Sequence, residues 1–252
     1  HRNIMLAYTA TIELDNPNVA NKYMDKIVYQ YDLRHFYNDK YSKQIKLLQS
    51  DVDRRTRILQ AMILSQYRRK VAEKHGLFIK PCILIKSPKI AASKEAYREF
   101  HEALNELTAN DIDNIFINAG SSILGYVKRF FKENNITNPN IVKELKEDFR
   151  EERTILINSK EDSEDKTNQI LVNTLESREN EIRAIFVVNM LNEGWDVLNL
   201  FDIVRIDEGV GSKKATVSEA QLIGRGARYF PFLLDDDQDK YKRKYDNDPD
   251  NE

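Results

Sequence analysis

Arg183-Ala184-Ile185-Phe186-Val187-Val188-Asn189 is a short apolar run of the kind that forms a strand buried on both faces. Residues 81–85 (PCILI) and 201–206 (FDIVRI) have the same character. Amphipathic segments with helical periodicity separate such runs, for example at 93–107 and 121–133. Short apolar strands that alternate with helices favour βαβ units and a mostly parallel sheet. We therefore predict an α/β fold.

The other expected elements follow from the same periodicities. Further strands are expected at 4–14, 26–32, 45–48, 115–118 and 154–157. Further helices are expected at 19–25, 52–74, 141–149, 166–175 and 217–228. Asp51 could cap the long helix that starts at residue 52, and His75-Gly76 could end it.

Ligands of parallel sheets bind at the carboxyl ends of the strands. The residues that follow the expected strands are therefore the candidates for function: Lys86-Ser87, 189–196 and Asp207-Glu208. We interpret the pair Asp207-Glu208 as structural, although it resembles the acidic pair of a nucleotide-binding strand.

The chain has 252 residues, of which 41% are hydrophobic, and this suits one large α/β domain with appendages. Its formal net charge is only −2, so any contact with nucleic acid must be local. Cys82 is the single cysteine, which excludes an intramolecular disulfide and suits the cytoplasm. The sequence shows no membrane-spanning run and no signal peptide. Because it starts at His1 and ends in an acidic tract, we expect a piece of a longer protein.

The stretch 221–228 (QLIGRGAR) carries the strongest functional signal. In a helix its polar residues and one glycine share a face, because they lie three, four and seven residues apart: Gln221, Gly224, Arg225 and Arg228. Two guanidinium groups beside a residue without a side chain suit a polyphosphate. The pattern Q-x-x-G-R-x-x-R is more specific than a basic patch, since four positions must agree.

A second signal follows the apolar run at 183–188. Gly194 allows the backbone to approach a ligand closely, and Asp196 could accept hydrogen bonds from a ribose or orient an arginine. Taken alone, this turn is better explained by a capping aspartate. A functional role for this turn is favoured because the arginine stretch follows it after one further strand.

The two signals, in this order, resemble motifs V and VI of superfamily 2 helicases and translocases. Residues 8–11 (YTAT) resemble motif III, which closes the first RecA-like domain of those proteins, and 83–87 (ILIKS) resemble motif IV. Longer blocks are similar to the helicase region of the Res subunit of type III restriction enzymes: 7–15, 31–33, 48–51, 189–200 and 218–232. The resemblance implies a RecA-like, P-loop-NTPase-type parallel sheet flanked by helices, without its own P-loop.

The resemblance also divides the chain into four parts. Residues 1–14 would end the first RecA-like domain, 15–50 would form an interdomain linker, and 51–234 would be the second RecA-like domain, the helicase C-terminal domain. Residues 235–252 would form an acidic tail or linker. Residues 108–180 carry no motif, so the assignment there is positional only.

Roles for individual residues follow from the same resemblance. Arg225 and Arg228 would reach the γ-phosphate of ATP across the interdomain cleft, one of them as an arginine finger, and Gln221 would position the nucleotide or the attacking water. Three residues would line the nucleotide: Gly194, Asp196 and Gly224. Three would contact the nucleic-acid backbone: Lys86, Ser87 and Asn189. Two would couple the nucleotide state to DNA binding: Thr9 and Thr11.

The expected cofactor is ATP with Mg²⁺, held mainly by a first RecA-like domain, because this sequence contains no G-x-x-x-x-G-K-[ST] loop. We expect an ATP hydrolase that translocates on DNA as the restriction subunit of a type III endonuclease, with a modification methyltransferase as partner. The chain alone should not hydrolyse ATP. The histidines show no metal-ligand spacing, so no metal site is expected within the chain.

Two alternatives remain open from the sequence. The chain could belong to an RNA or DNA helicase unrelated to restriction. It could also be a non-catalytic nucleic-acid-binding α/β module, in which Arg225 and Arg228 hold nucleic-acid phosphates. The basic residues of the helix at 52–74 could track phosphates as well, although such a run is more often a solvated helix face.

Overall fold

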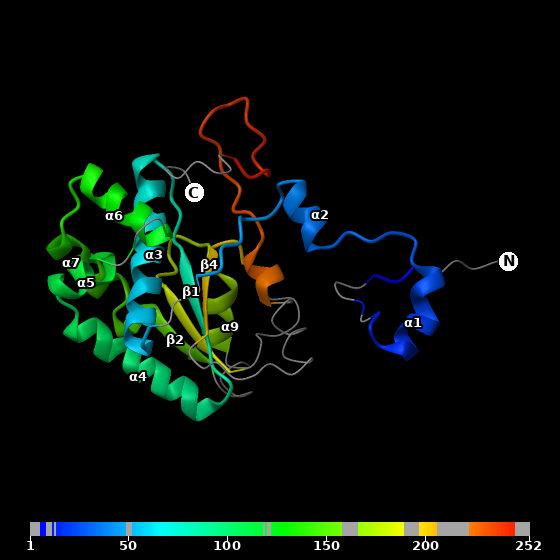
Figure 1. Ribbon diagram of the computed structural model, residues 1–252, viewed down its shortest axis with the longest axis horizontal. Helices are drawn as coiled ribbons and strands as arrows, with labels where there is room; N and C mark the ends of the chain where they lie inside the picture. The colour runs from blue at the N-terminus through cyan, green and yellow to red at the C-terminus, as the bar shows by residue number, and fades with distance from the viewer. Residues whose placement is uncertain are drawn as a thin grey trace.

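A computed structural model describes residues 6–8, 12, 14–48, 52–117, 119, 122–157, 166–188, 197–205 and 222–244 of the chain. At its centre is a four-stranded sheet in the order β2-β3-β1-β4, in which every neighbouring pair is parallel (Figure 1). The strands are β1 (Cys82–Lys86), β2 (Thr154–Ile157), β3 (Ala184–Val187) and β4 (Leu200–Arg205). The predicted α/β class with a parallel sheet is confirmed.

Helices cover both faces of this sheet (Figure 1). One face packs against α3 (Arg54–Lys74), α4 (Ile90–Glu106), α5 (Ala109–Ile117), α6 (Ile123–Glu133) and α7 (Asn138–Asp148). The strand residues in this core alternate along the chain: Ile83, Ile85, Ala184, Phe186 and Val204. The intervening residues face a smaller core with α9 (Lys166–Asn173) and Leu222. Since β1 and β3 are buried on both faces, their sequences are continuous apolar runs.

Helix α3 is the longest described helix, and its apolar residues from Ile58 to Tyr67 pack in the larger core. Asp53 caps its start, because the Asp53 carboxylate accepts a hydrogen bond from the Thr56 backbone nitrogen at 2.8 Å. The cap is thus two residues later than expected, and Asp51 lies outside the described residues. The helix ends at His75 and Gly76, whose φ of +69° is a left-handed conformation that glycine adopts without steric cost.

The amino ends of the strands are joined by a buried ionic cluster. Arg183, which is 1% exposed, directs Nη1 to Oδ2 of Asp148 at 2.9 Å. The same arginine donates to the carbonyl of Pro81 and to the hydroxyl of Ser65. Burial lowers the pKa of the Arg183 guanidinium, and the Asp148 carboxylate opposes this shift. This cluster links α3, α7, β1 and β3.

Three expected strands are absent from the described residues, and most of the strand expected at 4–14 lies outside them. Residues 27–32 and 43–48 run without strand pairing, and their apolar side chains lie open to solvent, with Val28 88% and Leu47 82% exposed. Alternation alone does not make a strand unless a neighbouring strand supplies hydrogen bonds. Residues 115–117 belong to α5 instead, because Ile112, Ile115 and Phe116 are buried at helical spacing. The described residues within 4–14 also lie in no strand.

The segment before α3 contains α1 (Pro17–Tyr23), the short helix η1 (Met24–Lys26) and α2 (Leu33–Asn38). The helix expected at 19–25 therefore exists, with a start at Pro17 that Asn16 caps. A further short helix, η2 (Glu151–Arg153), leads into β2. No described helix is both long and apolar enough to cross a membrane.

Candidate functional site

The carboxyl ends of β1, β3 and β4 meet at one edge of the sheet, as the sequence predicts. Lys86 ends β1 and lies in register with Val187 of β3 and Arg205 of β4. The next residue, Ser87, bonds its backbone nitrogen to the Val187 carbonyl at 3.0 Å. Lys86 is half-buried, whereas Ser87 is 1% exposed and its hydroxyl has no hydrogen-bond partner among the described residues. The buried Ser87 hydroxyl is therefore not accessible to a nucleic-acid backbone in this structure.

Several predicted site residues lie outside the described part of the chain, and their roles stay predictions. They are Thr9, Thr11, Asn189, Gly194, Asp196 and Gln221, together with the pair Asp207-Glu208. The described site therefore consists of Lys86, Ser87 and the residues from 222 to 228.

The arginine segment (residues 222–228) lies beside the edge strand β4 (Figure 1). Its backbone is helical from 222 to 226, turns at Ala227, and forms an antiparallel bridge to Ser42 at Arg228. Leu222 and Ala227 are buried, at 5% and 2% exposed. Arg225 is half-buried and Arg228 is exposed. The segment thus anchors Leu222 and Ala227, leaves Ile223 38% exposed, and places Arg228 at the surface.

This geometry corrects the prediction of one continuous helix through residue 228. The helical face holds for Gly224 and Arg225, but Arg228 has left the helix. Two physical causes are visible: glycine at 224 and 226 lowers helix propensity, and pairing with Ser42 satisfies the Arg228 backbone instead. Gly226 also permits a close approach, because an added Cβ would lie 3.2 Å from Cδ1 of Ile203 in β4.

The basic face of α3 is engaged within the domain. Arg55 pairs with Asp111 at 2.9 Å, and Arg68 bonds both oxygens of Asp202 at 2.7 Å. Lys70 pairs with Glu144 at 2.9 Å. These partners favour a structural role for the basic run over the alternative that it tracks phosphates.

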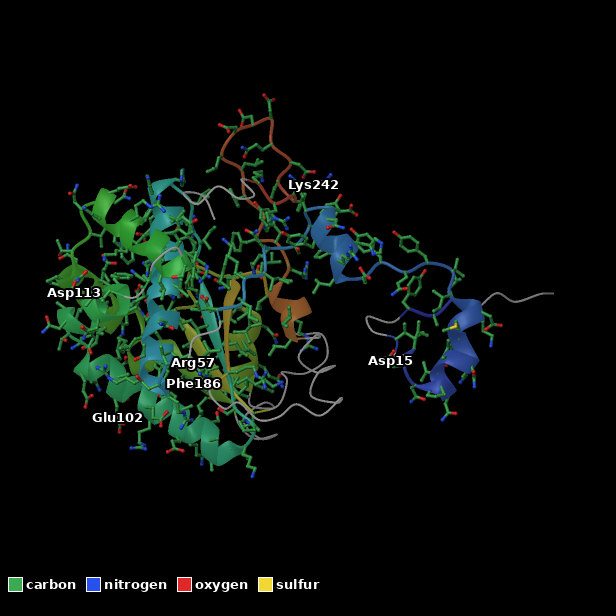
Figure 2. The ribbon with its side chains drawn as sticks, in the orientation of Figure 1. Asp15, Arg57, Glu102, Asp113, Phe186 and Lys242 are labelled. Atoms are coloured by element: carbon green, nitrogen blue, oxygen red, sulfur yellow. The ribbon has the colours of Figure 1, made fainter. Side chains whose placement is uncertain are left out.

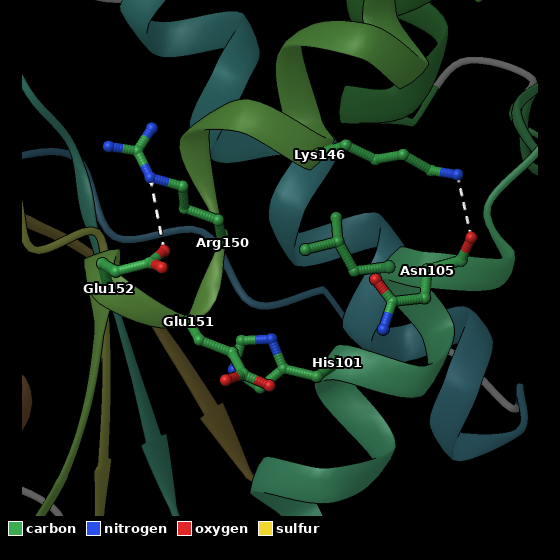
Figure 3. A pocket seen from close by; sticks show the side chains of 7 residues that line it. His101, Asn105, Lys146, Arg150, Glu151 and Glu152 are labelled. Carbon is green, nitrogen blue, oxygen red and sulfur yellow. Dashed lines mark hydrogen bonds and ion pairs between the residues drawn. The ribbon is translucent and has the colours of Figure 1, made fainter.

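A cavity of about 360 Å³ opens near the amino end of β2, away from the predicted site (Figure 3). Its walls include His101 and Asn105 of α4, Lys146 of α7, and the charged residues around η2. The charges are satisfied locally: Lys146 donates to the Asn105 carbonyl at 2.8 Å, and Arg150 pairs with Glu152 at 3.4 Å. Burial lowers the pKa of His101. Within the described ranges, no three His, Cys, Asp or Glu side chains gather as a metal site.

Sequence reasoning missed the residues that hold the arginine segment in place. The Lys43 ammonium donates to the Leu200 carbonyl of β4 and to the Gly226 carbonyl of that segment, and Arg243 donates to the carbonyl of Ser42, which pairs with Arg228. Both occur in polar sequence without a motif. Only contacts between distant parts of the chain identify them.

The parallel sheet with helices on both faces, and with an arginine segment beside its edge strand, is consistent with a RecA-like α/β domain. The chain is 34% identical over 226 residues to a probable type III restriction-modification enzyme HindVIP Res subunit of Haemophilus influenzae. The alignment covers 82% of this chain and 44% of that protein, so the chain spans less than half the length of this relative. The similarity supports a relationship to restriction enzymes of this helicase-like type.

Two other similarities cover shorter stretches of the chain. An uncharacterized protein of Haemophilus influenzae is 71% identical over 34 residues, which covers 14% of this chain and 7% of that protein. Residues 215–252 match the family model HI_1054_N, which is described as an N-terminal region. No solved structure matches the chain.

Proposed function

We propose that this chain is the second RecA-like domain of an ATP-driven DNA translocase, the Res subunit of a type III restriction system. In this proposal a first RecA-like domain holds ATP and Mg²⁺ through its own phosphate-binding loop. The present domain closes over the nucleotide and supplies positive charge from Arg225 and Arg228. Gln221, Gly194, Asp196 and Gly224 would complete the nucleotide side of the cleft.

The observation that carries the proposal is the placement of the arginine segment. Two of its apolar residues, Leu222 and Ala227, are anchored in the domain, while Arg228 is exposed and Arg225 is half-buried. A segment built only for stability would gain little from two arginines there, because an exposed ion pair contributes less than about 1 kcal/mol. The identity of 34% with a Res subunit supports the same assignment.

The magnitude of the proposed role is large. An arginine finger contributes roughly 10³ to 10⁵ in the rate of phosphoryl transfer. At about 1.4 kcal/mol for each factor of ten, that is on the order of 4 to 7 kcal/mol of transition-state stabilisation.

DNA would be the second ligand, contacted at the carboxyl edge of the sheet by Lys86, Ser87 and Asn189. Lys86 lies beside Arg205 in the strand register, so two cationic residues occupy this edge. Thr9 and Thr11 would couple the nucleotide state to DNA. A modification methyltransferase subunit would be the protein partner, and the cytoplasm the compartment.

The test uses the full-length protein that contains this chain, with its methyltransferase subunit and DNA. Arg225→Ala and Arg228→Ala are compared with Arg98→Ala, which removes an exposed arginine that pairs with Glu102 on α4. We expect kcat for ATP to fall by roughly 10³ or more in at least one of the two variants and to stay normal in Arg98→Ala. Normal turnover in both variants would refute the proposal.

The alternative of a non-catalytic nucleic-acid-binding module makes a different prediction. The arginine variants would then lose DNA affinity in a salt-dependent manner while ATP turnover stayed intact. An RNA or DNA helicase unrelated to restriction would keep the arginine dependence but would not associate with a methyltransferase. Co-purification of the tagged full-length protein distinguishes this case.

A further inference from the structure

The last residues of α2 and the chain that follows them cross the arginine segment and are bonded to it at several points. We call residues 37–43 the strap. The Lys43 backbone nitrogen donates to the Ala227 carbonyl at 2.6 Å, and the Tyr229 backbone nitrogen donates to the Tyr41 carbonyl at 3.3 Å. Ser42 pairs with Arg228 as a β-bridge. In Figure 1 the chain after α2 approaches the arginine segment, which is drawn in orange beside β4.

The Lys43 side chain continues this connection into the interior. Its ammonium donates to the carbonyls of Leu198 at 2.6 Å, Leu200 at 2.7 Å and Gly226 at 3.0 Å. An ammonium has three donors, and here all three are used by carbonyls from two segments. Nζ also lies 4.3 Å from the centre of the Phe201 ring. One group therefore ties the strap, the start of β4 and the arginine segment together.

Fold stability alone does not explain this lysine. Burial lowers the pKa of Lys43 to about 7, with Arg68 acting in the same direction and Asp202 and Glu176 opposing it. Burial therefore disfavours the protonated side chain at this position, and its three carbonyl partners offset part of that cost. The buried Lys43 ammonium is better explained by the segments that it holds together than by a gain in stability.

We propose that Lys43 is a positioning residue, which fixes the arginine segment against β4 so that Arg225 and Arg228 face the nucleotide. This inference rests on the proposed function of the two arginines. It adds that their placement depends on the strap, which belongs to the expected interdomain linker rather than to the RecA-like domain itself.

The C-terminal tract supports the strap from its other side. The Arg243 backbone nitrogen donates to the Lys40 carbonyl at 2.6 Å, and Nη1 donates to the Ser42 carbonyl at 2.7 Å. The Arg243 guanidinium lies 4.3 Å from the Tyr37 ring centre, and Arg243 is 8% exposed. Lys242 extends beside α2 (Figure 2). The strap is thus held between the arginine segment and this tract.

The test compares Lys43→Met with Lys80→Met in the full-length protein. Lys80 is a matched control, because it is also half-buried, donates to the Asn180 carbonyl and has a pKa lowered by burial. It precedes β1 and has no part in the strap. We expect Lys43→Met to lower kcat for ATP on the order of 10²-fold, as a displaced catalytic group does, with KM for ATP little changed. Lys80→Met should keep normal kcat.

A triple variant separates positioning from general damage. If Lys43 acts through the arginines, adding Lys43→Met to Arg225→Ala and Arg228→Ala should cause no further loss of kcat. An additional loss of the same size as in the single variant would overturn the inference. Should Lys43→Met fail to fold, Lys43→Gln takes its place with the same expectations, since its amide retains a donor for one carbonyl.

The outcomes distinguish this inference from the proposed function. Normal kcat in Lys43→Met, together with lost kcat in the arginine variants, overturns the role of Lys43 and leaves the proposed function standing. Normal kcat in the arginine variants overturns both.

Discussion

Replacement of Asp148 by asparagine tests how the amino ends of the strands are held. Asp148 is 5% exposed and faces three guanidinium groups. Its Oδ2 accepts from Arg183 at 2.9 Å and from Arg69, and its Oδ1 accepts from Arg153 at 3.0 Å. Asp148→Asn keeps the shape of the side chain and removes the only negative charge that Arg183 contacts among the described ion pairs.

The expected loss of stability depends on the partners that the arginines keep once the Asp148 charge is removed. Removing one partner of a buried ion pair costs about 3–5 kcal/mol, because the remaining charge is left uncompensated. Arg183 would keep its bonds to Pro81 and Ser65, and Arg69 would keep its pair with Glu73. We therefore expect a loss near the lower limit, about 3 kcal/mol, which is a large share of the 5–15 kcal/mol typical of a domain.

Urea denaturation of the purified chain, followed by circular dichroism, measures this loss. The control is Glu102→Gln on the exposed face of α4, where the ion pair with Arg98 has side chains 52% and 63% exposed (Figure 2). The control should change the free energy of unfolding by less than about 0.5 kcal/mol. An Asp148→Asn variant as stable as this control would refute the argument that the cluster is needed to neutralise Arg183.

Three further predictions concern the nucleotide side and pH. Gly224→Ala should leave the free energy of unfolding unchanged or raise it by up to about 1 kcal/mol, since nothing lies within 4 Å of the added Cβ. The ATPase activity of the full-length protein should fall. Unchanged ATPase activity would remove Gly224 from the proposed nucleotide surface. The lowered pKa of Lys43, about 7, means that unfolding takes up a proton between pH 7 and the ordinary lysine range. The free energy of unfolding should therefore rise with pH in that interval, and it should rise less steeply in Lys43→Met. The same slope in Lys43→Met and in the unmodified chain would contradict the burial of the Lys43 ammonium. Hydrogen bonding to Arg55 lowers the pKa of Asp111 to about 2, so its contribution is present above pH 4 and lost as pH falls toward 2. In Asp111→Asn the free energy of unfolding should fall less between pH 4 and pH 2 than in the unmodified chain. An equal fall in both would contradict the stabilising pair of Asp111 with Arg55.

The sheet was predictable because its strands leave a direct trace in the sequence. β1 and β3 are buried on both faces, so each is a continuous apolar run that cannot be taken for a solvated segment. The segment at 27–32 shows the limit of the method. Its alternation resembles a half-buried strand, yet no described strand lies beside it and Tyr29 is 77% exposed. Periodicity reports which side chains could share a face, but not whether a partner covers that face.

The residues of the candidate site were predictable only where a short sequence pattern identifies them. The arginine segment stands out because four residues recur at fixed spacing. Lys43 and Arg243 do not stand out, because their partners are backbone carbonyls, which any sequence provides. Arg183 was included in a strand-like run, and its burial against Asp148 depends on how α7 packs onto the sheet. Such contacts are properties of the folded chain rather than of any short pattern.

The most direct test of the central claim is single-turnover ATP hydrolysis by the full-length protein carrying both Arg225→Ala and Arg228→Ala, with DNA and Mg²⁺ at saturating concentrations. The account predicts that ATP still binds while the hydrolysis step slows by roughly 10³ or more, because the charge that stabilises the transferring phosphoryl group is gone. A hydrolysis step as fast as that of the unmodified protein would contradict the claim that this domain supplies that charge.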